Sequence, residues 1–325
     1  LIPFTQRKTS INILLSALAF IDIGLLLFAI PVFILPTLDR WDGFITLESV
    51  QAIVVKFLYP INLMFQTWSI YTIVLITAER WLAICRPLHV RSLCTPRTAK
   101  WSLLFTAVFS ALYNIVRFWE YSLSWAPDGS LFFERNLRDP TEHPFYVLWY
   151  YSMLFLVTHF LLPFGTIFTL NAVVCHRILR LRSVREQLTM KVSTSRAQHH
   201  DNVQKWFDIF EYFGHFMLLL VTLAFALCNA LPFLLNLAEC IKRDLFEAER
   251  TAQMAYLLND LANFLVILNS STTWIFYTSF SAKFREGVAA LFGLRSLLTR
   301  ASKKCQIMEE RFSVSATSNT QNQGF

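Results

Sequence analysis

The chain has 325 residues, of which 55% are hydrophobic and 16% are charged, and its formal net charge is +7. A soluble domain carries about 25% charged residues, and several apolar runs of this chain reach the ~20 residues that a helix needs to cross a bilayer. The composition therefore excludes a pair of ordinary soluble domains. It also argues against nucleic-acid binding, because the basic residues are spread over loops between the apolar runs.

Six apolar runs predict six helices that cross a membrane. A helix at the surface of a soluble protein shows a polar face about every 3.6 residues. By contrast, the first run has one charged residue, Asp22, and the second has only Lys56, near its start. We therefore predict an all-α membrane protein. The runs, in chain order, cover residues 12–35, 50–78, 101–118, 145–175, 213–237 and 254–276.

The loops between these runs differ in charge on the two sides of the membrane. The loops 39–48, 120–142 and 239–250 together hold twelve acidic and six basic residues, whereas the opposite set is rich in Lys and Arg. Basic loops stay on the cytoplasmic side. We therefore expect both ends of this chain, and the pair Glu79-Arg80, to face the cytoplasm.

The first residues, LIPFTQRKTS, look like a cytoplasmic turn that leads into the first apolar run. We therefore expect a further span before residue 1 and a bundle of seven spans in all, with a six-span protein as the alternative. In this interpretation residues 1–294 form the membrane bundle, and residues 295–325 form a disordered cytoplasmic tail.

Between the last run and this tail, an apolar stripe lies beside Lys283 and Arg285. Its spacing predicts an amphipathic helix on the membrane surface, and an ordinary amphipathic helix of a soluble tail is the alternative. The stripe consists of Phe284, Val288, Leu291 and Phe292.

Short motifs along the chain resemble those of the rhodopsin-like (class A) G-protein-coupled receptors. A narrower set resembles the invertebrate FMRFamide-type neuropeptide receptors. The first set, in chain order, is Leu18-Ala19-Phe20-Ile21-Asp22, Glu79-Arg80-Trp81, Pro163, Pro232, and Asn269-Ser270-Ser271 with Tyr277. The second set is Arg91-Ser92-Leu93-Cys94-Thr95-Pro96, Leu112-Tyr113-Asn114, Arg117-Phe118-Trp119-Glu120 and Leu258-Asn259-Asp260.

The resemblance implies a receptor bundle of seven transmembrane helices in the plasma membrane, whose first helix is absent from this sequence. It implies a receptor for an amidated FMRFamide-like neuropeptide that acts on a heterotrimeric G protein, with arrestin as a further partner. No cofactor and no enzymatic activity are expected. A divergent, signalling-impaired orphan receptor is one alternative. A polytopic transporter is another, although paired spans broken by Gly or Pro fit poorly with only 8 Gly.

Four polar residues within the spans are interpreted as a sodium or polar pocket. An ionisable residue inside a membrane span is costly and marks a functional site by default. Oxygens at similar depth predict a hydrated Na⁺, as in the family that the motifs resemble, and a hydrogen-bonded cluster that joins helices is the alternative. No other metal is expected. The four residues are Asp22, Ser69, Asn269 and Ser270.

The pair Glu79-Arg80 is interpreted, together with Tyr277, as the switch for G-protein coupling. Arg80 cannot lose its charge, so it pairs with Glu79 in a closed bundle and faces an inserted partner helix in an open one. The alternative is an interfacial arginine that extends toward the lipid headgroups.

Polar side chains toward the outer ends of the spans are candidates for the ligand pocket. Asn62 stands eighteen residues before Arg80, so an amine-anchoring Asp is absent at that position. The candidates are Tyr59, Asn62, Gln66, Glu120 and Asn259.

A disulfide that is typical of the family whose motifs this chain resembles is missing. The family's outer disulfide joins the start of the third span, here Val55 and Lys56, to the loop 120–145, and neither place has a cysteine. That disulfide therefore cannot form, and the outer surface lacks its usual covalent link. The cysteines are Cys85, Cys94, Cys175, Cys228, Cys240 and Cys305.

Overall fold

The computed structural model describes most of the predicted membrane bundle. The chain divides into two units, Leu1–Trp274 and Ile275–Phe325, and of the second unit only residues 275–280 are described. The described residues are 10–34, 48–127, 129–139, 141–191, 223–235, 237–238 and 249–280.

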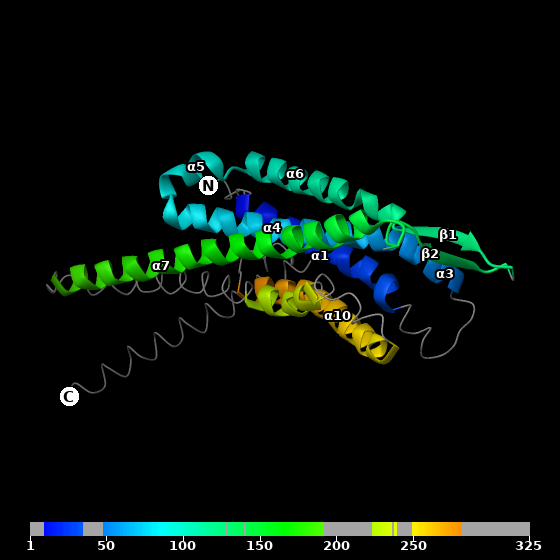
Figure 1. Cartoon of the computed structure of the whole chain (residues 1–325). Coiled ribbons are helices and arrows are strands. Elements are labelled where there is room, and N and C mark those ends of the chain that lie inside the picture. Colours follow the sequence, from blue (N-terminus) through cyan, green and yellow to red (C-terminus); the bar gives the residue numbers. More distant parts are fainter. Residues whose placement is uncertain are drawn as a thin grey trace, which may run out of the picture. The chain divides into compact units, whose positions relative to one another are not determined.

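The first three predicted spans are helices (Figure 1). The second is continuous from the short helix α3 to the end of α4, and it extends seven residues beyond the predicted run, to Cys85. The elements of this part are α1 (Ser10–Ala29), η1 (Ile30–Ile34), α3 (Glu48–Ile53), η3 (Val54–Leu58), α4 (Tyr59–Cys85), α5 (Pro87–Leu93), α6 (Pro96–Asn114) and η4 (Ile115–Trp119).

The second half adds a strand pair and further helices. α7 runs sixteen residues past the predicted end at 175, because the following residues, rich in Leu and Arg, favour helix although they are too charged for a bilayer. The elements are β1 (Tyr121–Trp125), β2 (Leu131–Arg135), η5 (Tyr146–Leu154), η6 (Val157–Leu161), α7 (Leu162–Lys191), the helix Leu223–Leu235 and α10 (Glu249–Phe280).

Four helices of the described chain are long and apolar enough to cross a membrane by length and composition. A fifth helix, Leu223–Leu235, is apolar but shorter within the described residues. α10 is also long enough, and it carries Asn259, Asp260 and Asn263. The four are Ser10–Phe33, Ser49–Cys85, Pro96–Trp119 and Tyr146–Leu181.

Prolines mark where two helices begin. Pro87 and Pro96 stand in the first turns of α5 and α6, where a backbone N–H has no helical partner in any case, whereas Pro60 lies where η3 continues into α4. Thr95 caps α6, because its Oγ1 accepts a 3.2 Å hydrogen bond from the backbone N–H of Thr98.

α4 is the helix on which three other described helices pack. It contacts α1, α6 and α7 (Figure 1). α1 and α4 pack closely at Gly24, where a Cβ would lie 2.4 Å from Cε1 of Phe65. Buried apolar side chains of these two helices include Leu18, Ile21, Leu25, Ile70, Ile73 and Ile76.

The loop 120–142 contains a β-hairpin, which was not predicted from the sequence. β1 and β2 are antiparallel, with Tyr121 opposite Arg135 and Trp125 opposite Leu131. The turn uses Gly129 with a φ of 85°, a conformation that favours glycine. The described chain is otherwise helical, as predicted, and the hairpin is a local addition in a segment that was predicted to be a loop.

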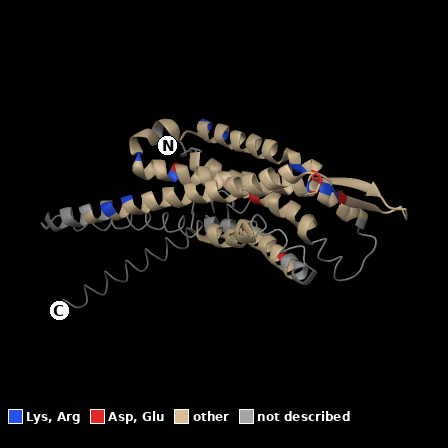
Figure 2. Ribbon diagram, in the orientation of Figure 1, with Lys and Arg blue, Asp and Glu red and all other residues tan. Residues whose placement is uncertain are grey.

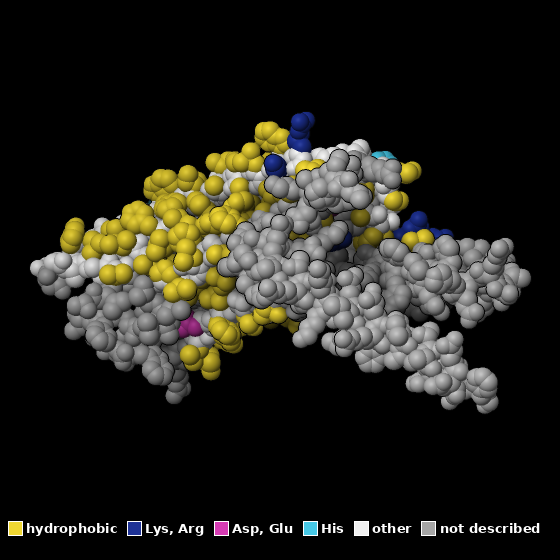
Figure 3. All heavy atoms as spheres, turned by 180° about the vertical axis from the view of Figure 1, so that it is seen from behind, with side chains coloured by type: hydrophobic (Ala, Val, Ile, Leu, Met, Phe, Trp, Pro, Cys, Tyr) yellow, Lys and Arg dark blue, Asp and Glu magenta, His cyan; other side chains and the backbone are white. Residues whose placement is uncertain are grey.

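The surface of the described helices suits a lipid environment. Large apolar side chains such as Phe105 and Phe168, each 73% exposed, point away from the bundle, and hydrophobic atoms cover much of the visible described face (Figure 3). Charged side chains gather near the helix ends, and the long middle stretches carry few (Figure 2). Hydrocarbon tolerates this pattern, because no charge has to be stripped of water on the lipid face.

Several predicted features lie outside the described residues. These are the cytoplasmic tail 295–325, the first half of the run 213–237, and the surface helix with Phe284, Val288, Leu291 and Phe292. The backbone of Tyr277 belongs to α10, but its side chain is not described. Each of the four described cysteines is a free thiol.

Candidate functional site

Two members of the predicted sodium or polar pocket meet between α1 and α4. Ser69 Oγ donates a 2.7 Å hydrogen bond to Asp22 Oδ1, and both residues are buried. The other two members, Asn269 and Ser270, are buried in α10. One hydroxyl leaves most of the acceptor capacity of the Asp22 carboxylate for a cation, a water or another donor.

The predicted switch lies in the last two turns of α4. Glu79 Oε2 accepts a 2.9 Å hydrogen bond from Ser10 Oγ, at the start of α1. Within the described part of the chain, the buried Nε of Arg80 has no hydrogen-bond partner. The carboxylate is thus held by a neighbouring helix, and the guanidinium keeps donor capacity for another partner.

The predicted ligand-pocket residues differ in exposure. Tyr59 and Gln66 are half-buried on α4, and Asn259 on α10 is exposed. Asn62 on α4 is buried, and Glu120, directly after η4, is fully buried. Glu120 is therefore the most deeply buried of the five predicted ligand-pocket residues.

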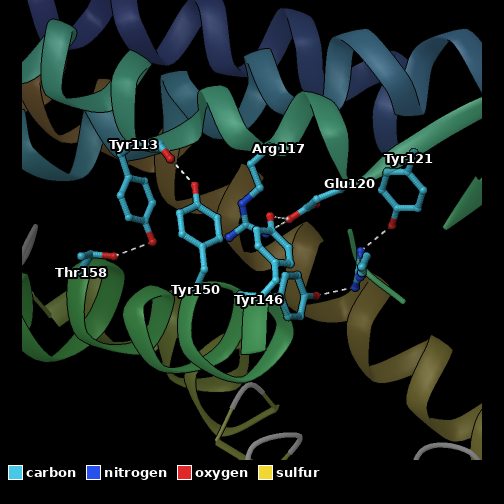
Figure 4. A network of polar contacts seen from close by, with 9 residues as sticks. Tyr113, Arg117, Glu120, Tyr121, Tyr146, Tyr150 and Thr158 are labelled. Atoms are coloured by element: carbon cyan, nitrogen blue, oxygen red, sulfur yellow. Dashed lines mark hydrogen bonds and ion pairs between the residues drawn. The ribbon is translucent and has the colours of Figure 1, made fainter. Parts of the chain in front are cut away.

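Glu120 forms a buried ion pair with Arg117. Arg117 Nη1 lies 2.6 Å from Glu120 Oε1, and the two side chains are 1% and 0% exposed. Tyr146 donates a 2.7 Å hydrogen bond from its hydroxyl to the same oxygen (Figure 4). A charge that is out of water needs such partners, because an unpaired buried ion is very costly.

Aromatic rings complete the surroundings of Arg117. Its guanidinium carbon lies 5.2 Å from the ring centroid of Tyr150, 5.1 Å from that of Tyr151 and 5.5 Å from that of Phe155. The negative faces of such rings attract a cation. The helix η5–α7 therefore contacts the ion pair of Arg117 and Glu120 through the hydroxyl of Tyr146 and through aromatic rings.

A second polar network lies deeper, between α4, α6 and the helix η5–α7. Asn114 Nδ2 donates to Thr67 Oγ1 at 2.9 Å, and Thr67 Oγ1 lies 2.9 Å from His159 Nε2. On the other side of the ring, Thr158 Oγ1 lies 3.1 Å from His159 Nδ1 and donates to the hydroxyl of Tyr113 at 2.9 Å (Figure 4). Such contacts satisfy polar groups inside a membrane bundle and join its helices.

The two networks are linked through the hydroxyl of Tyr150, which donates to the backbone carbonyl of Tyr113 (Figure 4). From the sequence, Glu120 was predicted as a ligand-pocket residue, Tyr113 and Arg117 were quoted only as parts of motifs, and His159 was assigned no role. The signal was present, since Arg117 and Glu120 stand three residues apart in an apolar helix, where side chains at i and i+3 are neighbours.

The turn that follows β2 is ordered by its own hydrogen bonds. Asp139 accepts from the hydroxyl of Thr141 at 2.6 Å and from its backbone N–H at 2.8 Å. These two hydrogen bonds lower the pKa of the exposed Asp139 carboxyl. The turn fixes the chain next to Arg138, which contacts the hairpin.

Comparison with known proteins identifies the family. Residues 2–277 match the family described as 7 transmembrane receptor (rhodopsin family). The FMRFamide peptide receptor frpr-18 of Caenorhabditis elegans is 45% identical over 86% of this chain and 61% of its own length. The FMRFamide receptor of Drosophila melanogaster is 29% identical over 90% of this chain and 50% of its own length.

The chain thus spans between half and about three-fifths of the length of these curated relatives. The similarity confirms the resemblance that the motifs indicated. It also agrees with the expectation of a receptor rather than an enzyme. The chain belongs to the rhodopsin family of seven-transmembrane receptors.

Proposed function

We propose that this chain is the membrane bundle of a plasma-membrane receptor for an amidated FMRFamide-like neuropeptide, and that it activates a heterotrimeric G protein. The observation that carries the proposal is the 45% identity to an FMRFamide peptide receptor over 86% of the chain. An alignment that covers 86% of the chain includes the segments 112–120 and 258–260, where the narrower motifs stand.

The geometry supports a ligand that is rich in hydrogen-bond donors. Within the described residues, Glu120 Oε2 and Asn62 Oδ1 are buried acceptors without a hydrogen-bond partner. An unpaired buried acceptor costs free energy that a donor from a ligand would recover. The guanidinium and the terminal amide of an Arg-Phe-amide peptide are such donors. We assign Tyr59, Asn62, Gln66 and Glu120 to the ligand side of the bundle, with Asn259 on the opposing α10.

For coupling, we assign Glu79, Arg80 and Tyr277 to the cytoplasmic switch. The positive-inside distribution of Lys and Arg supports a cytoplasmic C-terminus, and a Ser/Thr-rich tail suits arrestin once it is phosphorylated. The same proposal includes a first span before residue 1 and a surface helix after α10. The pair Asp22–Ser69, with Asn269 and Ser270, is the proposed sodium site.

The experiment is a G-protein activation assay in cells. The chain is expressed alone and fused behind the first span of the Caenorhabditis elegans relative, each with an extracellular epitope tag that reports surface display. FMRFamide and other peptides ending in Arg-Phe-amide are applied, and their free acids serve as matched controls. We expect the fused form to respond to amides at least about tenfold more potently than to the acids, a difference of ~1.4 kcal/mol.

A receptor displayed at the surface that answers none of the amides contradicts the proposed ligand class. Equal potency of amides and free acids contradicts the role of the terminal amide. Equal display and coupling of the chain alone and of the fused form contradicts the additional span.

A further inference from the structure

The hairpin β1–β2 is attached to the helices without any covalent link. Residues 95–174 contain no cysteine, and the described cysteines nearest in sequence, Cys94 and Cys175, are free thiols. The hairpin nevertheless contacts α3, η3 and η4. Its position therefore depends on hydrogen bonds and ring contacts.

Two hydrogen bonds tie the hairpin backbone to the start of the helix α3–η3–α4. Lys56 Nζ, on η3, donates to the backbone carbonyl of Tyr121, the first residue of β1. Ser49 Oγ, on α3, accepts a 2.9 Å hydrogen bond from the backbone N–H of Leu131, the first residue of β2. One contact holds the base of the hairpin and the other holds it near the tip, where Leu131 pairs with Trp125.

The side chain of Tyr121 adds a third attachment. Its ring is 9% exposed and meets the ring of Tyr59 edge to face, with centroids 6.5 Å apart. Its hydroxyl accepts a hydrogen bond from Arg138 Nη1 (Figure 4). The guanidinium carbon of Arg138 also lies 4.4 Å from the ring centroid of Tyr151 on η5, and Arg138 Nη2 donates a hydrogen bond to the Tyr151 hydroxyl. Tyr121 is thereby connected to α4 directly and to η5 through Arg138.

We propose that Tyr121 is the positioning residue of the outer face, and that Lys56, Arg138 and Tyr151 form with it a non-covalent clasp that holds the hairpin between the helices α4 and η5. Hydrogen bonds from charged donors are stronger than neutral ones. The attraction between a cation and the aromatic rings beside it is stronger when both are out of water. The clasp performs by non-covalent contacts what a disulfide would do in a chain with cysteines at these places.

The clasp also fixes the ligand side of the bundle. Glu120 directly precedes Tyr121, and its backbone carbonyl accepts a 2.8 Å hydrogen bond from the N–H of Asn136 beyond β2. Displacement of Tyr121 therefore displaces Glu120 and its ion pair with Arg117. This consequence rests on the proposed function, whereas the clasp itself does not.

Hydrogen–deuterium exchange of the segment 121–135 tests the clasp in the purified receptor in lipid nanodiscs. The variants are Lys56→Met and Arg138→Met. Lys56→Arg and Tyr121→Phe are the conservative partners, because the first keeps a donor and the second keeps the ring. Arg135→Met, an exposed arginine on the same hairpin, is the matched control.

We expect Lys56→Met and Arg138→Met each to speed exchange in the hairpin by about tenfold or more, and Arg135→Met to leave it within twofold. Lys56→Arg restores slow exchange, and Tyr121→Phe gives an intermediate rate. Unchanged exchange in both methionine variants overturns the clasp, whatever the ligand is.

The peptide responses of the same variants distinguish a positioning role of the clasp from a simple loss of folded receptor. Loss of the clasp raises the peptide concentration for half-maximal response and leaves the maximal response per displayed receptor unchanged. A fall in displayed receptor alone, with unchanged potency, overturns the positioning role. Absence of any peptide response in the unmodified receptor contradicts the proposed function, and the exchange result still decides the clasp.

Discussion

Glu120→Gln is the substitution whose outcome follows most directly from the geometry. It removes the negative charge of a pair in which both side chains are at most 1% exposed. The glutamine keeps one acceptor oxygen for Tyr146, so the change acts mainly on Arg117. The guanidinium then remains out of water with its charge uncompensated.

The magnitude follows from the loss of one partner of a buried ion pair, which costs ~3–5 kcal/mol. The rings of Tyr150, Tyr151 and Phe155 attract the guanidinium before and after the substitution, so they do not change the difference between the two proteins. We therefore expect a loss of folding free energy of ~3–5 kcal/mol.

The assay is thermal unfolding of the purified receptor in nanodiscs, with a double-mutant cycle. Replacing a whole buried pair by neutral groups is often neutral, so Arg117→Met should recover most of the loss when it is combined with Glu120→Gln. Glu134→Gln is the matched control, since Glu134 is exposed on β2 and bonds only weakly to Ser124 Oγ at 3.0 Å. A Glu120→Gln variant as stable as the control, or a double variant less stable than either single one, refutes the reasoning.

Two further substitutions address the contact between α1 and α4. Asp22→Asn should change agonist affinity and its dependence on Na⁺ more than stability, because the asparagine still accepts the hydrogen bond from Ser69; radioligand binding with and without Na⁺ checks this, and an unchanged Na⁺ response leaves only a helix-joining role. Gly24→Ala should destabilise the receptor by ~1–3 kcal/mol, because a Cβ there lies 2.4 Å from the Phe65 ring. Gly165→Ala, where a Cβ meets nothing within 4 Å, is the control, and equal unfolding temperatures contradict the close packing.

The spans could be predicted because a membrane helix needs only a continuous run of ~20 predominantly apolar residues, which can be seen directly in the sequence. Each long apolar run becomes a helix, since an unpaired backbone polar group in hydrocarbon is too costly. The predicted run 145–175 ends sixteen residues before the observed helix, because α7 continues to Lys191 through residues that favour helix but not lipid. The pair Asp22 and Ser69 could also be anticipated, since both are polar within apolar runs.

The hairpin and its attachments could not be predicted in the same way. The segment 121–135 is short, and its charges and its Pro-Asp-Gly turn are as typical of a loop as of a hairpin. The position of Arg138 between Tyr121 and Tyr151 depends on three segments that meet only in the folded chain. The role of His159 could not be predicted, because Thr67, whose Oγ1 lies 2.9 Å from His159 Nε2, belongs to a different helix.

The central claim is that a peptide at the outer end acts through Arg80 at the inner end of α4. Tyr59, Asn62 and Gln66 precede Arg80 by at least fourteen residues, which at 1.5 Å per residue is ~21 Å or more. Direct contact between peptide and Arg80 is therefore excluded, and coupling requires a rearrangement of helices, for which ~1–3 kcal/mol is typical.

The most direct measurement is peptide-stimulated nucleotide exchange on a purified heterotrimeric G protein. The receptor is in nanodiscs and is fused behind the first span of the Caenorhabditis elegans relative, either unmodified or with Arg80→Ala. Saturation binding of the same amidated peptide is measured on both samples. We predict stimulated exchange for the unmodified receptor, and for Arg80→Ala we predict its loss with an affinity change of about 5–150-fold at most. Near-normal exchange by Arg80→Ala, or no stimulation of the unmodified receptor despite peptide binding, contradicts the account.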